Sequence, residues 1–199
     1  MKHKLLSALF IATLILFGCS KPELLDGPKR SLLYEPLDIS LEGLANRAIA
    51  GLYVYDPNDN WKIEKVTDSE VVIDLNEEKT LPDDYPETLT ISHADNNTYL
   101  VKLLTTRNSF DYYYTDLVNN FLIDKKGKQL KNYNLGHIDV HSKTVNGNEE
   151  TVIDGHNKDW NMQAKFIWYV DSHNEYSHNP DRDKSSDLLE AQILYTKES

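Results

Sequence analysis

After Gly51 the chain adopts a two-residue hydrophobic period, and this period constrains its fold more than any other feature. It is clearest in residues 160–170, where every second side chain is apolar: Trp160, Met162, Ala164, Phe166, Trp168 and Val170. Successive side chains of a strand point to opposite faces, so this pattern gives the segment one apolar face. Residues 160–170 are therefore predicted to form a strand that lies on a core.

Similar short runs, rich in β-branched and aromatic residues, fill most of the chain. They are separated by clusters of Asp, Asn, Gly and Pro, which favour turns. The predicted strands are 51–56, 61–66, 70–75, 88–93, 98–106, 109–117, 119–124, 136–145, 150–154, 160–170 and 190–197. The last of them is read as the return strand of a hairpin with a long loop at 171–187, and a terminal helix starting at Ser186 is the alternative.

The expected fold class is all-β, a mainly antiparallel meander that forms a barrel or a sandwich. One short helix precedes it at 40–50, with Ser40 or Asp38 as its cap and Gly51 as its stop. This order resembles lipocalin-like domains, whose first strand often opens Gly-x-Trp, and here Tyr53 stands at the tryptophan position. The resemblance implies a barrel, with the sandwich as the alternative.

The first residues have the form of a secretory leader. Lys2 and Lys4 are followed by an uncharged, mostly apolar run from Leu5 to Gly18. A finished membrane-spanning helix needs about 17–25 apolar residues, so this run is too short to be a permanent span and has the length typical of a signal peptide.

The end of this leader, Leu16-Phe17-Gly18-Cys19, resembles a bacterial lipobox. The resemblance implies diacylglyceryl attachment to the sulfur of Cys19, cleavage after Gly18, and acylation of the new amino terminus by a fatty acid such as palmitate. Several acyl chains on one residue make a durable membrane anchor. Ser20 follows the cysteine, where enterobacterial inner-membrane lipoproteins carry aspartate, so the resemblance implies the outer membrane and a domain that faces the periplasm.

Three regions are therefore expected. Residues 1–18 are the signal peptide, residues 19–37 are the lipidated cysteine and a tether containing Pro22, Gly27 and Pro28, and residues 38–199 are a single β-rich domain. The 180 residues after Cys19 are enough for one domain with a core.

Charge and cysteine content limit the partners and the chemistry. Removal of the leader takes away Lys2 and Lys4, which leaves 19 basic and 32 acidic residues and a net charge of −13 with His neutral. Nucleic acid is a poor partner for such a chain, whereas a basic protein would be attracted. Cys19 is the one cysteine, so its lipidation leaves no thiol for a disulfide or a nucleophile.

The candidate metal site is the set His137, Asp139 and His141. On a strand these alternate residues share one face, and imidazole and carboxylate are zinc ligands. Neighbours on that face are about 6.5–7 Å apart, so a further ligand from another element would be needed. The alternative is the solvent face of an amphipathic strand, with Ile138 and Val140 buried.

The candidate binding surface is Tyr112, Tyr113 and Tyr114. In a strand Tyr112 and Tyr114 would face one way and Tyr113 the other, and tyrosine is enriched in interface hot spots. The alternative is a cross-strand aromatic ladder within the sheet.

The sequence contains none of the common catalytic or phosphate-binding motifs, so no enzyme, and no cofactor beyond the lipid on Cys19 and an optional divalent metal, is expected. The leading functional hypothesis is a membrane-anchored lipoprotein that binds a protein partner in the cell envelope, as an assembly factor or an immunity protein does. The first alternative is a lipocalin-like carrier of a small apolar ligand, and the second is a metal-dependent module using His137, Asp139 and His141.

Overall fold

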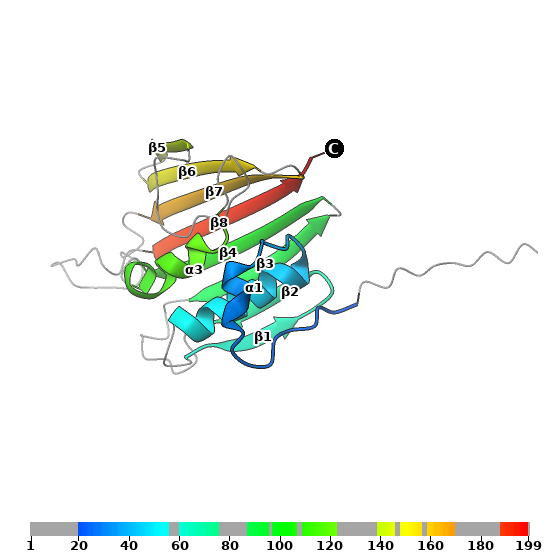
Figure 1. The fold of residues 1–199 in the computed structure, drawn as a ribbon. Coiled ribbons are helices and arrows are strands. Elements are labelled where there is room, and N and C mark those ends of the chain that lie inside the picture. Colours follow the sequence, from blue (N-terminus) through cyan, green and yellow to red (C-terminus); the bar gives the residue numbers. More distant parts are fainter. Residues whose placement is uncertain are drawn as a thin grey trace, which may run out of the picture.

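The structure is a computed structural model (Figure 1) that describes residues 20–55, 60–75, 87–95, 97–106, 109–122, 139–145, 148–156, 159–169 and 188–198. In 139–145 and at 111, 112 and 149 it describes the backbone alone.

The described elements include two α-helices and eight strands. In chain order they are η1 (Arg30–Tyr34), α1 (Leu41–Tyr55), β1 (Lys62–Val66), β2 (Glu70–Asp74), β3 (Thr88–Asp95), β4 (Thr98–Thr106), η2 (Phe110–Tyr114), α3 (Thr115–Asn119), β5 (Asp139–Val145), β6 (Asn148–His156), β7 (Trp160–Tyr169) and β8 (Leu188–Lys197). None of the described helices is long and apolar enough to cross a membrane.

The eight strands form one antiparallel sheet in the order β1-β2-β3-β4-β8-β7-β6-β5. The prediction of a mainly antiparallel β fold is confirmed. The described strands are not closed into a barrel, because β4 pairs with β8 in the middle of the sheet and this leaves β1 and β5 at opposite edges.

The order of elements repeats once along the chain. A helix followed by a four-strand meander occurs as α1 with β1 to β4, and again as η2 and α3 with β5 to β8. The two meanders meet through nine paired positions between β4 and β8. Both helical elements lie on the same face of the sheet (Figure 1), which we call the helix-side face, and the opposite one is the far face.

Helix α1 begins where the sequence predicted but ends later. The Ser40 hydroxyl accepts a hydrogen bond from the Gly43 amide at 3.0 Å, which is an N-cap interaction. Gly51 does not stop the helix, and the predicted strand at 51–56 is wrong, since α1 continues to Tyr55. A Cβ atom at Gly51 would lie 2.6 Å from Cδ1 of Leu117, so this glycine serves the close approach of α1 to α3.

The predicted strand at 109–117 is also wrong, because this segment forms η2 and α3. The predicted strand at 119–124 is wrong over its described residues, 119–122, which end α3 and form a turn. Buried residues recur at helical spacing through both segments: Phe110, Tyr114, Leu117, Val118 and Phe121. The Thr115 hydroxyl donates a hydrogen bond to the Phe110 carbonyl oxygen at 2.9 Å, which closes the turn between the two elements.

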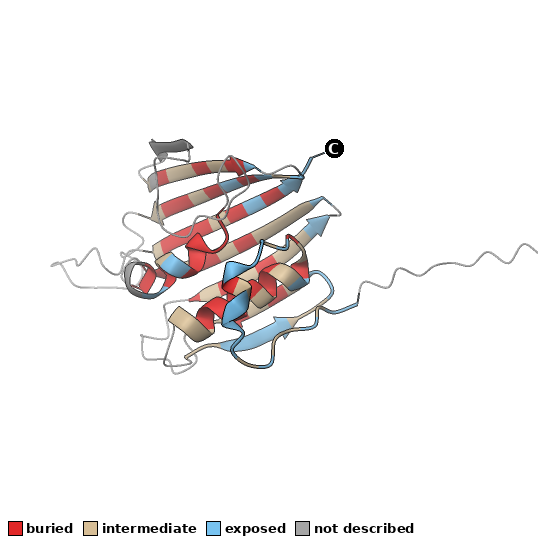
Figure 2. Cartoon of the chain, in the orientation of Figure 1, coloured by how far each residue is buried: buried red, intermediate tan, exposed pale blue. Residues whose placement is uncertain are grey.

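The predicted hairpin at the end of the chain is confirmed. Strands β7 and β8 pair from Trp160 opposite Lys197 to Tyr169 opposite Leu188, and the terminal-helix alternative is wrong. Burial alternates along both strands (Figure 2), because one face carries the core. Phe166 lies on that face, with its ring centroid 6.0 Å from that of Phe110 in η2.

The N-terminal strap, residues 20–39, packs on the domain. Leu33 is buried, and Leu24, Leu25 and Leu37 are partly buried against the core. This is the part of the chain in which the sequence predicted a tether, and its described residues are held by apolar contacts.

Candidate binding face of the sheet

The far face of the sheet carries the polar half of each strand. The described helices lie on the helix-side face, so none of them covers the far face (Figure 1). Strand pairing places the side chains of β4, β8, β7 and β6 next to one another there: Lys102, Glu190, Gln192, Leu194, Gln163, Lys165, Glu150 and Asp154.

Glu190 is the centre of a hydrogen-bonded group on this face. It is buried, and its carboxylate accepts hydrogen bonds from the side chains of Tyr169, at 3.2 Å, and Gln192. The Lys102 ammonium lies 3.3 Å from the same carboxylate. Because each oxygen is engaged, Glu190 is a structural anion rather than a free general base.

The pKa values of this group follow from its surroundings. Burial acts to raise the pKa of Glu190, but the Gln192 hydrogen bond and the charge of Lys102 outweigh it, and the pKa is lowered from its ordinary value. Burial raises the pKa of Tyr169, and the neighbouring Glu190 charge raises it further. Glu190 is therefore ionised and Tyr169 is a neutral donor at neutral pH.

Glu150 forms a second ion pair on the far face. It is buried, and its carboxylate lies 2.9 Å from the Lys165 ammonium. Both buried acids on this face therefore face a lysine. Neither pair has the geometry of two carboxylates that share a proton or flank a bond.

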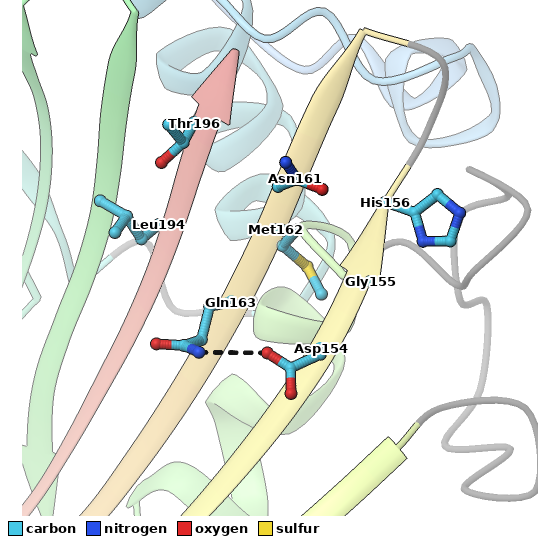
Figure 3. Close-up of a pocket in the computed structure, with 8 residues that line it drawn as sticks. All are labelled: Asp154, Gly155, His156, Asn161, Met162, Gln163, Leu194 and Thr196. Carbon is cyan, nitrogen blue, oxygen red and sulfur yellow. Dashed lines mark hydrogen bonds between the residues drawn. The ribbon is translucent and has the colours of Figure 1, made fainter. Parts of the chain in front are cut away.

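An open depression of about 510 Å³ lies beside these pairs, where β6 and β8 end and β7 begins (Figure 3). Its lining consists of Asp154, Gly155, His156, Asn161, Met162, Gln163, Leu194 and Thr196. Gln163 donates a hydrogen bond to Asp154 at 3.1 Å. Leu194, which also lines the depression, is 38% exposed. The depression thus combines amide, carboxylate, imidazole and hydroxyl groups with one exposed aliphatic side chain.

The predicted metal ligands are only partly within the described chain. His137 lies outside the described residues, and Asp139 and His141 lie in β5, where the backbone alone is described. The register places Asp139 opposite Asp154 of β6 and His141 opposite Val152. Among the described residues no group of three or more His, Cys, Asp or Glu side chains is placed to hold a metal ion.

The three predicted surface tyrosines have different environments. Tyr113 is 45% exposed, whereas Tyr114 is buried in the core. The side chain of Tyr112 lies outside the description. The tyrosines separate because η2 is helical, so neighbouring residues point in different directions around its axis. Cys19, the predicted lipidation site, also lies outside the described residues.

Sequence reasoning missed the residues that line the depression. Alternation along 160–170 indicates only that Asn161 and Gln163 lie on the polar side of a strand, and no sequence pattern marks Asp154, His156 or Leu194 as site residues. The available signal was the pair of amides at alternate positions of 160–170. Their convergence with residues of β6 and β8 depends on strand register, which no short sequence pattern fixes.

No protein-family model, curated protein or solved structure matches the chain.

Proposed function

We propose that this chain is a bacterial lipoprotein whose domain binds a protein partner in the cell envelope and has no enzymatic activity. The lipobox-like Leu16-Phe17-Gly18-Cys19 supports lipidation of Cys19, and Ser20 supports the outer membrane. The acyl chains would hold the protein on the membrane with the domain in the periplasm.

The observation that carries the binding proposal is the depression on the far face. Protein interfaces use a few well-placed polar groups beside apolar side chains, and here Gln163 of β7 lies opposite the exposed Leu194 of β8, with Asn161 two residues away on β7. Side-chain amides present both donors and acceptors, so these two residues are suited to hydrogen bonding with a peptide backbone.

The charge of the mature chain indicates the kind of partner. A net charge of −13 attracts a basic protein and raises its association rate. An immunity protein that covers a basic toxin surface and an envelope assembly factor both fit this description. Nucleic acid does not fit it, because the phosphates would be repelled.

Site-specific photo-crosslinking tests the proposal in living cells. A photoreactive amino acid is placed at Leu194 on the far face, and the matched control is placed at Tyr113 on η2, which is similarly exposed at 45% against 38%. A discrete protein adduct from position 194 and none from position 113 is the expected result. Adducts from position 113 alone would move the interface to the predicted tyrosine surface, and adducts from neither position would reject the proposed binding mode.

Acyl analysis tests the anchor independently. The wild-type protein should carry diacylglycerol on Cys19 and sediment with membranes, whereas Cys19→Ala should remain unprocessed and carry no lipid. A wild-type chain without an acyl mass would contradict the lipoprotein proposal whatever the crosslinking shows.

A metal-dependent module is the second candidate, and one observation favours it. Directly opposite residues on antiparallel strands have Cβ atoms about 4.5–5.5 Å apart, so Asp154 is the nearest carboxylate that β6 could add to Asp139. In zinc titration calorimetry, Asp154→Asn and Asp139→Asn should then weaken binding equally, with Asp116→Asn as the control. Absence of heat for the wild-type protein would remove this candidate.

The lipocalin-like carrier has less support in the described fold. A carrier needs an apolar cavity, whereas the helix-side face of the sheet packs against α1, η2 and α3 in one continuous core. We therefore place binding on the far face.

A further inference from the structure

The N-terminal strap is fastened to α1 by one amide side chain. Asn46 accepts a hydrogen bond from the Leu25 amide at 2.9 Å and donates one to the Glu23 carbonyl oxygen at 2.9 Å. In a β-sheet a neighbouring strand binds a segment in the same way, through one backbone N–H donor and one backbone C=O acceptor. The Glu42 carboxylate accepts a third bond, from the Glu23 amide at 3.0 Å.

A buried guanidinium fastens the other end of the strap. Arg47 is only 3% exposed, and it donates hydrogen bonds to the carbonyl oxygens of Glu35, at 2.8 Å, and Pro36, at 3.1 Å. Between these points Leu33 is buried in the protein. The strap is therefore fixed from Glu23 to Pro36 and cannot act as a flexible spacer over that length.

The length of chain left for spacing is very short. Glu23 is the fourth residue after Cys19, and an extended chain spans at most about 3.6 Å per residue, so this link reaches about 14 Å. From these contacts and this length we infer that the face formed by the strap and the first turns of α1 lies on the phospholipid surface that holds the anchor. This inference rests on the proposed lipidation of Cys19.

The charge of this face identifies the kind of lipid surface. The strap carries three basic and four acidic residues, and it surrounds a hollow of about 200 Å³ that is also lined by both signs of charge, including Lys29, Glu35, Asp38 and Glu42. Such a surface has no net attraction for anionic lipid, whereas zwitterionic headgroups meet both of its charges. The short link, rather than a basic patch, holds this face on the bilayer.

The contact orients the rest of the molecule. The described chain begins, in blue, at one side of the domain, and α3 lies toward the other side (Figure 1). In a domain that is held this way α3 points away from the lipid. A domain on a free tether would instead rotate, and every exposed residue would meet the membrane equally.

Fluorescence quenching separates the two arrangements. A mature chain with acylated Cys19 has no other cysteine, so a single introduced cysteine carries a single label. Two exposed positions are compared, Asp26→Cys on the strap and Asp116→Cys on α3. The lipidated protein is reconstituted in phosphatidylethanolamine and phosphatidylcholine vesicles with nitroxide-labelled headgroups. We expect quenching several-fold stronger at position 26 than at position 116.

Two further variants, each with a control, show whether the short link and the hydrogen bonds from Asn46 to the strap cause this difference. A long glycine-serine insert between Ser20 and Lys21 leaves the folded domain intact, and it should reduce quenching at position 26 to the level of position 116. The same insert between Glu198 and Ser199 is the control and should change nothing. Asn46→Ala should also equalise the two positions, whereas Asn161→Ala, an exposed amide on the far face, should not.

The outcomes distinguish this inference from the proposed function. A lipidated protein that floats with the vesicles but is quenched equally at both positions overturns the inference alone. An unlipidated protein that does not float overturns both the inference and the proposed anchor.

Discussion

The hydroxyl of Tyr195 on β8 donates a hydrogen bond to the carbonyl oxygen of Phe121, 74 residues earlier in the chain and directly after α3. Both side chains are fully buried. The last carbonyl groups of a helix have no partner within it, and a buried one needs a donor from elsewhere. Tyr195 therefore joins the central strand of the sheet to the end of α3.

Removal of this hydroxyl should destabilise the protein measurably. Tyr195→Phe leaves the buried Phe121 carbonyl without its donor, which costs about 1–3 kcal/mol in the free energy of unfolding. Urea denaturation checks this. Tyr169→Phe is the matched control, because its hydroxyl bonds to Glu190 at a partly exposed position where water can replace it. Equal losses for the two variants would contradict the assigned role of Tyr195.

Alkaline titration should reveal the same residue. Burial raises the pKa of Tyr195 well above its ordinary value of 10.0, although the charge of Arg47 opposes this. Since the folded state holds the proton more tightly, the stabilisation is complete below pH 10 and is lost as the pH rises through the folded pKa. Tyrosinate absorbance should show that Tyr195 ionises only with unfolding, and Tyr195→Phe should remove its contribution to that step.

Local sequence patterns predict some elements well, and they fail where contacts between distant parts of the chain determine the secondary structure. The Ser40 cap and the β7–β8 hairpin are predictable because capping and hydrophobic alternation depend on residues that are close in the sequence. The prediction that Gly51 ends the helix is wrong because the glycine is needed for the close approach of Leu117, which belongs to another element. The tyrosines of η2 suggested a strand through their β propensity, which the helical spacing of buried residues overrode.

The candidate site was less predictable than the fold. The polar alternation of 160–170 predicts that Asn161 and Gln163 point away from the core. Gln163 meets Asp154 and Leu194 because the strand register places it opposite Asp154 of β6 and opposite Leu194 of β8. Register of this kind depends on the whole sheet, and it cannot be derived from one segment.

The crossing at Gly51 gives a further stability prediction. Alanine in a helix interior is usually about 1 kcal/mol more favourable than glycine. At Gly51 its Cβ would lie 2.6 Å from a buried Leu117 methyl group, and overpacking of a core costs about 1–3 kcal/mol. Gly51→Ala should therefore lower the midpoint of urea unfolding, and a raised midpoint would show that Leu117 relaxes freely. In the control, Leu117→Ala removes the methyl group that the new Cβ would meet, and in this background Gly51→Ala should raise the midpoint.

Acid should weaken the Glu190 group on the far face. The pKa of Glu190 is lowered in the folded protein from its ordinary value of 4.5, so its contribution is present above that pH and is lost as the pH falls through the folded pKa. Glu190→Gln should flatten the decrease of melting temperature on acidification below pH 4.5. Glu70→Gln is the control, since its pair with Lys65 is largely exposed and contributes little. Identical acid limbs for wild-type protein and Glu190→Gln would contradict the assignment.

Arg47 should protect the strap from proteases. Its guanidinium holds the carbonyl groups of Glu35 and Pro36, and methionine can fill a similar volume but donates no hydrogen bond. We expect Arg47→Met to lose about 1–3 kcal/mol of stability. Trypsin cuts after the exposed Lys29 and Arg30, which flank or begin η1, so the variant should also be cleaved there several-fold faster than the wild type, as measured by mass spectrometry. Lys65→Met, which removes an exposed cation from β1, should leave this cleavage rate unchanged. If Arg47→Met is cut at the wild-type rate, the strap is held by its leucines and by Asn46 without help from the buried guanidinium.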